Sequence, residues 1–455
     1  MAAVLPRLVP PRITPPAQPL AGLAFVARFV RNPIAVVPQA AYDGDLVAGM
    51  RGRTPIVWIT APALIKQVLL DEREKFLKLA QIRLLGPLLG KGILTSEGAD
   101  WKWQRQASAP MFRPQELDGF VPTFVRAAER VIERWRARPA AVQPVDRAMT
   151  EATFEVISAT LLPSGDERMP QAIERSTGLF QRSGAWGQLY AIANLPRWLP
   201  QTGRRSMASA VGALRAAVGA LIAERRAHPQ AKDDLLHRLM QARDPESGQS
   251  MNDEQLVDNL LTFYLAGHET TAKALTWTLY LLARSPGWTR VLEEEIARVT
   301  GGAPINAGHV AELVLTQQVL KESMRLYPPV PLMTRQAVAE TRLGEYAVRA
   351  GTSVVMPIYA IHRHAKRWAD ADAFDPARFA PEKEAAIPRY QYMPFGAGPR
   401  ICIGMGFAMM EATAMLATLL RHARFAPLAG RDPAPVARVT LIPGGGMPLA
   451  VRLRP

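Results

Sequence analysis

The chain is 455 residues long and contains a single cysteine, Cys402. It lies in the stretch 395–411, FGAGPRICIGMGFAMME, where glycines and a proline precede a run of strong helix formers. A loop with so little side-chain bulk lets backbone N–H groups approach a ligand closely. Just before a helix, the dipole and the unpaired amides favour an anionic sulfur, so we expect the Cys402 pKa to fall below about 8.5. Thiolate is the metal-binding form of cysteine. The chain is therefore expected to fold around this loop.

Other interpretations of the loop have to be weighed. A lone cysteine is most often a small buried apolar residue. Gly396 and Gly398 begin a G-x-G-x-x-G phosphate loop, but Ile401 stands where the third glycine belongs. A zinc site would need further soft ligands, and there is no second cysteine. The choice is then between a buried apolar cysteine and a metal ligand.

The loop matches all fixed positions of the pattern F-x-x-G-x-R-x-C-x-G, which are Phe395, Gly398, Arg400, Cys402 and Gly404. In this the chain resembles the cytochrome P450 family of heme-thiolate enzymes, and the resemblance runs from about Arg53 to the end. It implies a mainly α fold with a small β-rich lobe, and heme b between a long central helix and the cysteine loop. Cys402 would be the iron ligand, and Phe395, Gly396, Arg400 and Gly404 would contact the heme.

Composition sets wider limits. Hydrophobic residues make up 48% and charged residues 21%, an ordinary globular mix. One cysteine excludes an intrachain disulfide and suits a reducing compartment. The net charge of +15 could favour binding to nucleic acid, to an anionic membrane or to an acidic protein. Because the arginines are scattered, we expect no nucleic-acid partner. Separately, we expect a cytoplasmic monomer.

The first 50 residues form a separate part of the sequence. Prolines recur between Pro6 and Pro19, which favours an extended arm. Leu20–Val30 is apolar but shorter than the roughly 20 residues that span a bilayer. No signal-peptide pattern is present, and a peripheral membrane contact stays open. We divide the chain into this arm and apolar segment, 1–50, and one oxygenase domain, 51–455.

Periodicity and breakers predict the other elements. Leu84–Leu94, with several glycines and a proline, is expected to be a mobile loop, and Gly184–Ala191 a helix–loop–helix lid. The Gly444–Gly446 turn is expected to join Val439–Ile442 and Leu449–Leu453 in a hairpin. The remaining predictions are strands at Thr54–Thr60, Glu345–Val348 and Thr352–Met356, and helices at Ala61–Leu70, Phe120–Arg136, Ser206–Arg226 and Leu313–Leu326.

A helix of roughly 50 Å is predicted from Asn252 to Ser285. Its middle, Ala266–Thr271, carries a glycine, hydroxyls and a carboxylate that are poor choices for a helix interior, which predicts a widened or kinked turn. H-E-x-x-H zinc chemistry fails because residue 272 is alanine. A solvated helix face is the simpler alternative.

The resemblance gives that block and two other motifs their roles. Glu269 and Thr270 would deliver protons to oxygen, while Ala266 and Gly267 would leave room for O2. Trp101 and Arg105, in a G-x-x-W-x-x-x-R frame, would point to a heme propionate, as would Arg335. The remaining family positions are a brace under the cysteine loop, Glu322, Arg325 and Arg378, and a substrate pocket, Phe263, Val330, Leu332, Met333 and Leu441.

The resemblance further implies a stand-alone, bacterial-type monooxygenase that inserts one atom of O2 into an apolar organic substrate. The segment after Cys402 is too short for a reductase domain, so electrons are expected from a separate ferredoxin or flavodoxin. Two rivals are a heme-thiolate protein that isomerises or dehydrates without external electrons, and a heme-based gas sensor. The Glu269–Thr270 pair favours oxygen activation over both.

Overall fold

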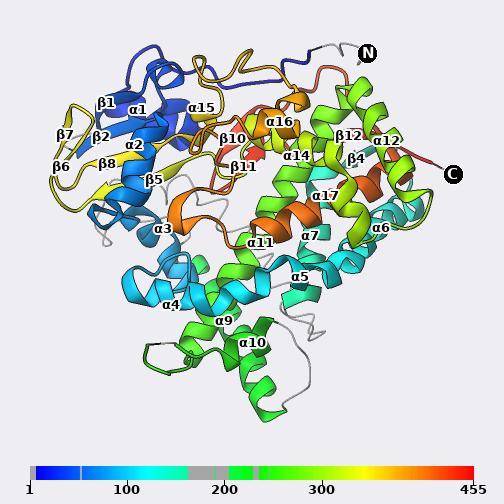
Figure 1. Ribbon diagram of the computed structural model, residues 1–455, viewed down its shortest axis with the longest axis horizontal. Coiled ribbons are helices and arrows are strands. Elements are labelled where there is room, and N and C mark those ends of the chain that lie inside the picture. Colours follow the sequence, from blue (N-terminus) through cyan, green and yellow to red (C-terminus); the bar gives the residue numbers. More distant parts are fainter. Residues whose placement is uncertain are drawn as a thin grey trace.

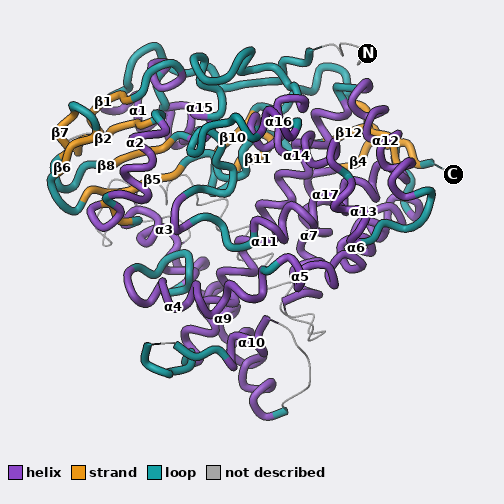
Figure 2. The backbone as a smooth tube through the Cα atoms, viewed as in Figure 1, coloured by secondary structure: helices purple, strands orange, loops and turns teal. Residues whose placement is uncertain are grey.

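A computed structural model describes residues 7–51, 54–161, 190, 204–228, 235–244 and 246–454. Helices fill most of the molecule, and the largest sheet lies at one side (Figures 1 and 2). This sheet has the order β1-β2-β8-β5-β3, in which β2 and β8 are parallel and the other neighbours antiparallel. A mainly α fold with a small β-rich lobe is thus confirmed.

The helices are α1 (Gly22–Arg31), α2 (Pro62–Lys66), α3 (Leu79–Leu89), α4 (Gly98–Ser108), α5 (Pro114–Leu117), α6 (Val121–Ala137), α7 (Val145–Leu161), α9 (Arg204–Ala227), α10 (Leu235–Gln241), α11 (Asp253–Ala283), α12 (Pro286–Thr300), α13 (Ala307–Glu312), α14 (Val314–Leu326), α15 (Ile358–Ile361), α16 (Pro381–Glu384) and α17 (Met405–His422). The strands are β1 (Leu46–Arg51), β2 (Thr54–Ile59), β3 (Phe76–Leu77), β4 (Val142–Pro144), β5 (Met333–Ala337), β6 (Thr341–Leu343), β7 (Tyr346–Val348), β8 (Ser353–Met356), β9 (Ala423–Ala426), β10 (Pro435–Ala437), β11 (Leu441–Pro443) and β12 (Pro448–Leu453).

Helix α11 forms the centre of the molecule (Figure 1). It begins with a capping box: the Asn252 side chain accepts from the Gln255 N–H at 2.9 Å, and the Gln255 side chain accepts from the Asn252 N–H at 3.0 Å. Most of its residues are buried on all sides, as expected of a core helix. It packs against α7, α9, α14 and α17. The predicted central helix is therefore confirmed.

Three predicted elements are wrong in detail. Leu84–Leu94 is not a loop throughout, because α3 continues to Leu89 and buries Leu85, Leu88 and Leu89 at helical spacing, which outweighs the internal Pro87. The expected hairpin does not form: β11 pairs with β10, while β12 pairs with β4 and β9. The turn at Ala266–Thr271 is not widened, since α11 stays α-helical there. The predicted lid at 184–191 lies outside the described residues, apart from residue 190.

The proline-rich arm runs extended up to α1 and lies against the segment before α16. The Phe374 N–H donates to the Leu8 carbonyl at 2.8 Å, and Arg7 and Arg12 pair with Asp370 and Asp372. By length and composition, Ser206–Ala227 of α9 is the one described helix that could cross a membrane, and 33% of it is buried inside the molecule. That is weak support for a membrane span.

Candidate functional site

The cysteine loop is held by its own backbone. The Cys402 N–H donates to the Phe395 carbonyl at 2.9 Å, and the Ile401 N–H donates to the Gly398 carbonyl at 3.1 Å. Gly398 has φ +70°, and a Cβ there would lie 2.8 Å from the Leu69 carbonyl oxygen. Glycine is therefore required at this position. Helix α17 begins three residues after Cys402.

Cys402 is exposed and lines a cavity of about 370 Å³. Burial raises the pKa of the thiol above its ordinary value, although the Gly404 N–H and the Arg105 charge act in the opposite direction. The expected fall in the pKa is therefore wrong for the protein alone, because desolvation outweighs the helix terminus. A bound metal ion reverses this, since a coordinating thiol is deprotonated.

Helix α11 supplies another wall of this cavity, including Ala266, Gly267, Glu269 and Thr270. The Thr270 hydroxyl donates to the Ala266 carbonyl at 2.7 Å, which leaves the lone pairs of its Oγ1 free to accept. The Glu269 carboxylate accepts from the Thr440 hydroxyl at 2.8 Å. A hydroxyl and a carboxylate thus share the cavity with the cysteine, so the alternative of a solvated outer face does not apply.

Gly267 has a packing reason as well. A Cβ at this position would lie 2.5 Å from Cδ1 of Ile157 on α7. Real Cβ atoms do not approach that closely, so a larger residue would require the Ile157 side chain to move. The glycine therefore permits a close helix–helix approach beside the cavity.

Four cations border the cavity, namely Lys78, Arg105, Arg335 and Arg400. Of these, Arg400 pairs with Glu97 and lies 3.9 Å above the Trp101 ring, and Arg105 donates to the Ile401 carbonyl at 2.8 Å. Burial lowers the pKa of Arg335 and of Arg400 to about 10. The Glu97 carboxylate pairs with one of three arginines, which leaves positive charge that is uncompensated, so this wall suits a ligand with two negative groups.

Lys78 is the member of this wall that sequence reasoning missed. Burial, together with the charges of Arg400 and Arg335, lowers the pKa of Lys78 to about 7. Its ammonium donates to the Leu94 carbonyl at 2.7 Å. No local motif marks it, because its neighbours come from segments far apart in the sequence.

The residues of the predicted brace lie together, with Glu322 and Arg325 completely buried and Arg378 partly buried. Arg325 binds Glu322 with two hydrogen bonds of 2.7 Å, and Arg378 approaches the same carboxylate at 3.5 Å. A paired arginine–carboxylate contact of this kind is rigid and strong. Arg325 also donates to the carbonyls of Ala371 and Ala373 at 2.7 and 2.9 Å.

His362 connects the brace to the cysteine loop, and no local motif marks this residue. Its carbonyl accepts from Arg325 at 2.8 Å, and its Nε2 accepts from the Met393 N–H at 2.8 Å. The Met393 carbonyl then accepts from the Gly396 N–H at 3.1 Å. Burial, and next the Arg325 charge, lower the pKa of His362 to about 3, so the ring is neutral and can accept.

The expected substrate residues divide into two groups. Phe263, Val330 and Met333 line the cavity, whereas Leu332 and Leu441 do not. Leu441 is buried elsewhere, and its carbonyl accepts from the Trp277 indole at 2.9 Å. The structure adds Ile93 and Leu94 to the wall.

A clamp on α11 fixes the loop that carries these two residues. Asn259 accepts from the Ile93 N–H at 3.0 Å and donates to the Gln104 side chain at 3.0 Å. Asp258 accepts from the Lys91 N–H at 2.6 Å. A Cβ at Gly92 would lie 2.4 Å from the Thr262 hydroxyl oxygen, so only glycine allows this close approach.

Within the described residues, no group of three or more His, Cys, Asp or Glu side chains could hold a metal ion. A metal at this cavity would take Cys402 as a single protein ligand and need its other ligands from a prosthetic group. The donor set fits heme: one thiol, a cationic wall for two carboxylates, and a cavity lined largely by apolar side chains.

Comparison with known proteins agrees with this fit. A family model described as Cytochrome P450 matches residues 14–447. Cyclooctatin synthase of Streptomyces melanosporofaciens is 32% identical over 95% of this chain and 94% of its own length. Cyclooctat-9-en-7-ol 5-monooxygenase of the same organism is 29% identical over 88% and 86%. The crystal structure of the cytochrome P450DA heme domain has the same fold, with a TM-score of 0.83 at 24% identity over 98% of this chain and 99% of that one.

Proposed function

This chain belongs to the cytochrome P450 family and is a heme-b-dependent monooxygenase, and we propose that it oxidises an apolar organic substrate with electrons from a separate ferredoxin or flavodoxin. The observation that carries the proposal is the single cavity shared by Cys402, the Glu269–Thr270 pair and the cationic wall. The family uses O2, an organic substrate and a redox partner.

When bound, the heme supplies the oxygen-activating chemistry that no side chain can provide. We propose that Cys402 is its iron ligand, within the loop that contains Phe395, Gly396 and Gly404. Lys78, Arg105, Arg335 and Arg400 hold the two propionates, with Trp101 stacked under Arg400. Glu322, Arg325 and Arg378 keep the cysteine loop in position through His362.

Proton delivery falls to α11 in this proposal. The Glu269 carboxylate, which accepts a hydrogen bond from the Thr440 hydroxyl, takes up a proton and passes it towards the cavity. Thr270 accepts a hydrogen bond on Oγ1 while its own hydroxyl continues to donate to the Ala266 carbonyl. The acid moves the proton and the hydroxyl positions it without ionising.

The substrate side follows from the lining. Phe263, Val330, Met333, Ile93 and Leu94 present apolar surface to the cavity, which favours a hydrocarbon-rich molecule. The relative that carries the name cyclooctat-9-en-7-ol 5-monooxygenase acts on an unsaturated alcohol by that name. We propose a substrate of comparably low polarity for this chain.

The tests are spectroscopic and kinetic. The reduced, carbonyl-bound protein is expected to give a thiolate-type Soret band that Cys402→Ser lacks; a band at the same position in both proteins would refute Cys402 as the ligand. Thr270→Ala is expected to lower product formed per electron pair by at least about tenfold while heme content stays constant. Unchanged coupling would refute the proton relay, and product formation without electron consumption would favour an isomerase.

The net charge of +15 suits an acidic electron donor that docks near Trp101–Arg105 and the cysteine loop. Turnover with such a donor is then expected to fall as salt rises, because charges are screened beyond about 8 Å at 0.15 M. Salt-independent turnover would contradict this part. We further propose a cytoplasmic monomer, which size-exclusion chromatography and cell fractionation test directly.

A further inference from the structure

A group of buried aromatic rings begins directly behind one wall of the Cys402 cavity. Trp277 lies on α11, one helical turn after Ala274, which lines that cavity, and residues at this spacing are neighbours on one helix face. The Trp277 indole donates to the Leu441 carbonyl at 2.9 Å, and the residue before Leu441, Thr440, also lines the cavity. Trp277 therefore lies next to the wall of the space that fits heme.

The Trp277 ring contacts two tyrosines. It stacks on Tyr327 with ring centroids 3.9 Å apart, and it meets Tyr280 edge to face at 5.9 Å. All three side chains are at most 1% exposed. Indole and phenol rings give up one electron more readily than phenylalanine or aliphatic side chains. Because the rate of electron transfer falls steeply with distance, rings in contact exchange an electron quickly, and Trp277 connects the cavity wall with both tyrosines.

The branch through Tyr280 ends at a carboxylate that reaches solvent. The Tyr280 hydroxyl donates to Asp432 Oδ1 at 2.8 Å, and the Asp432 side chain is 51% exposed. The hydrogen bond from Arg284 lowers the pKa of Asp432, so this group is ionised at neutral pH and has room for a proton. Burial, and next the hydrogen bond to Asp432, raise the pKa of Tyr280 to about 12. The phenol thus keeps its proton until it is oxidised, and an oxidised phenol is a far stronger acid than a carboxylic acid.

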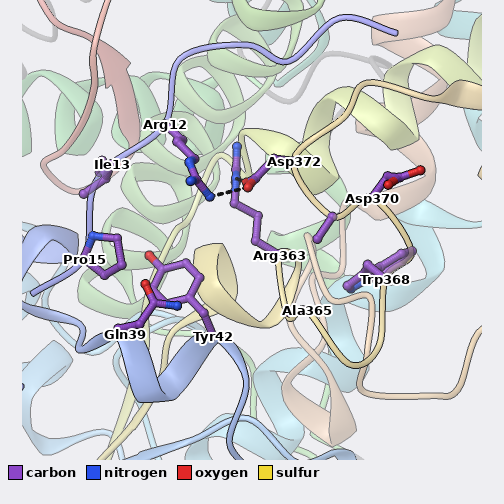
Figure 3. A pocket seen from close by; sticks show the side chains of 11 residues that line it. Arg12, Ile13, Pro15, Gln39, Tyr42, Arg363, Ala365, Trp368, Asp370 and Asp372 are labelled. Carbon is purple, nitrogen blue, oxygen red and sulfur yellow. Dashed lines mark hydrogen bonds and ion pairs between the residues drawn. The ribbon is translucent and has the colours of Figure 1, made fainter. Parts of the chain in front are cut away.

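The branch through Tyr327 ends at a carbonyl instead. The Tyr327 hydroxyl donates to the Pro11 carbonyl at 2.8 Å, and an amide oxygen is too weak a base to keep a proton at neutral pH. The guanidinium of Arg363, which Figure 3 shows near the proline-rich arm, lies 5.6 Å from the Tyr327 ring and 3.9 Å from the Tyr359 ring. A cation there opposes a further positive charge on either ring. Oxidation is therefore expected to come to rest at Tyr280.

We propose that Trp277, Tyr280 and Asp432 form a route by which an oxidising equivalent leaves the heme site when no substrate accepts it. One electron passes from Tyr280 through Trp277 to the oxidised site, and the phenolic proton moves to Asp432, which leaves a neutral tyrosyl radical. A reductant in solution, such as ascorbate, then returns one electron, and the proton goes back from Asp432. This route needs heme in the cavity, but neither the substrate nor the electron donor proposed above. It would protect the methionines that line the cavity from oxidation, namely Met324, Met333, Met393 and Met409.

Hydrogen peroxide is the oxidant for the test, added to the ferric holoenzyme without substrate. As the peroxide is reduced to water it removes two electrons from the heme site, and Tyr280 replaces one of them. Freeze-quench EPR should then detect a radical whose signal narrows when the protein carries ring-deuterated tyrosine. Tyr280→Phe and Trp277→Phe should each lose this tyrosine signal, and their Soret bands should bleach faster than that of the wild type. Asp432→Asn should lower the radical yield, because an amide does not take up the proton.

Tyr327→Phe is the matched control, because it keeps a ring on Trp277 and removes the phenol whose hydroxyl donates to a carbonyl. It should keep the tyrosine signal and the bleaching rate of the wild type. The carbonyl-bound Soret band and the coupling with substrate should stay unchanged in Tyr280→Phe, which separates a failure of this route from a failure of the oxygenase function. An undiminished tyrosine signal in Tyr280→Phe would overturn the proposal. So would the lack of any tyrosine signal in the wild type, or its loss in Tyr327→Phe.

Discussion

Glu411 on α17 allows the most exact test of the electrostatics of the core. Its carboxyl group is completely buried beside Thr271, and burial raises its pKa from 4.5 to about 8 despite a hydrogen bond from Thr271. Its Oε1 has no hydrogen-bond partner within the described chain. The folded protein therefore holds this group protonated at neutral pH, whereas the unfolded chain ionises it.

The sign of the effect follows from linkage. Below pH 4.5 both states are protonated and Glu411 causes no pH dependence. Between pH 4.5 and 8 the unfolded state gains stability by about 1.4 kcal/mol per pH unit, and above pH 8 the effect levels off. Between pH 5 and pH 7, Glu411 should thus lower the free energy of unfolding by about 2.5 kcal/mol.

Glu411→Gln keeps the shape and removes the titration. Relative to wild type, its free energy of unfolding should rise by about 2.5 kcal/mol between pH 5 and pH 7, as measured by urea unfolding of both holoenzymes at pH 5, 6 and 7. Glu295→Gln is the control, because the Glu295 carboxylate accepts three hydrogen bonds from Leu315 and Thr316; it should destabilise at pH 7. If the Glu411→Gln difference were equal at pH 5 and pH 7, the carboxyl group would not be held neutral.

Three further predictions concern the cysteine loop and the cavity wall. Gly398→Ala should cost about 2–3 kcal/mol and lower the heme-to-protein ratio, because φ is +70° and a Cβ meets the Leu69 carbonyl; Gly430→Ala, with φ +69° and open space, should keep full heme content. His362→Phe leaves the Met393 N–H unsatisfied and should cost about 1–3 kcal/mol at pH 7. Because the folded pKa of His362 is depressed, the wild type should also lose about 1.4 kcal/mol per pH unit as the pH falls from 6.5 to 5, and His362→Phe should lack this slope. Asn259→Ala should speed hydrogen exchange at the Ile93 amide by at least about tenfold with heme content unchanged, and equal exchange would contradict the clamp.

The parts that could be predicted from the sequence depend on neighbours along the chain. The cysteine loop, the capped start of α11 and the Glu322–Arg325 spacing each lie within a few residues, so their geometry follows from local rules. The prediction of a loop at Leu84–Leu94 was wrong because burial of its leucines against other segments stabilises a helix despite the local glycines and proline. The predicted hairpin was wrong because its two strands belong to different sheets: β11 pairs with β10, and β12 pairs with β4 and β9.

Residues that act through distant partners could not be found in this way. The pKa values of Lys78 and His362 are lowered first by burial among distant segments, and next by the charges of Arg400 and Arg335 in one case and of Arg325 in the other. The same holds for Cys402, whose local setting favours the thiolate while the surrounding core favours the thiol. A pKa is set by the whole environment, and burial is its least local component.

The cationic wall and the cysteine that lines the same cavity then require one common explanation. Three arginines with one carboxylate would be costly to bury for structure alone, and desolvation drives the thiol towards its neutral form when no metal ion is bound. Each cost is removed by a group that carries two negative charges on one edge and a metal ion at its centre. The two features come from segments separated by up to about 300 residues, and either alone would admit a simpler explanation. Their meeting in one cavity is what makes heme the group that this fold is built to hold.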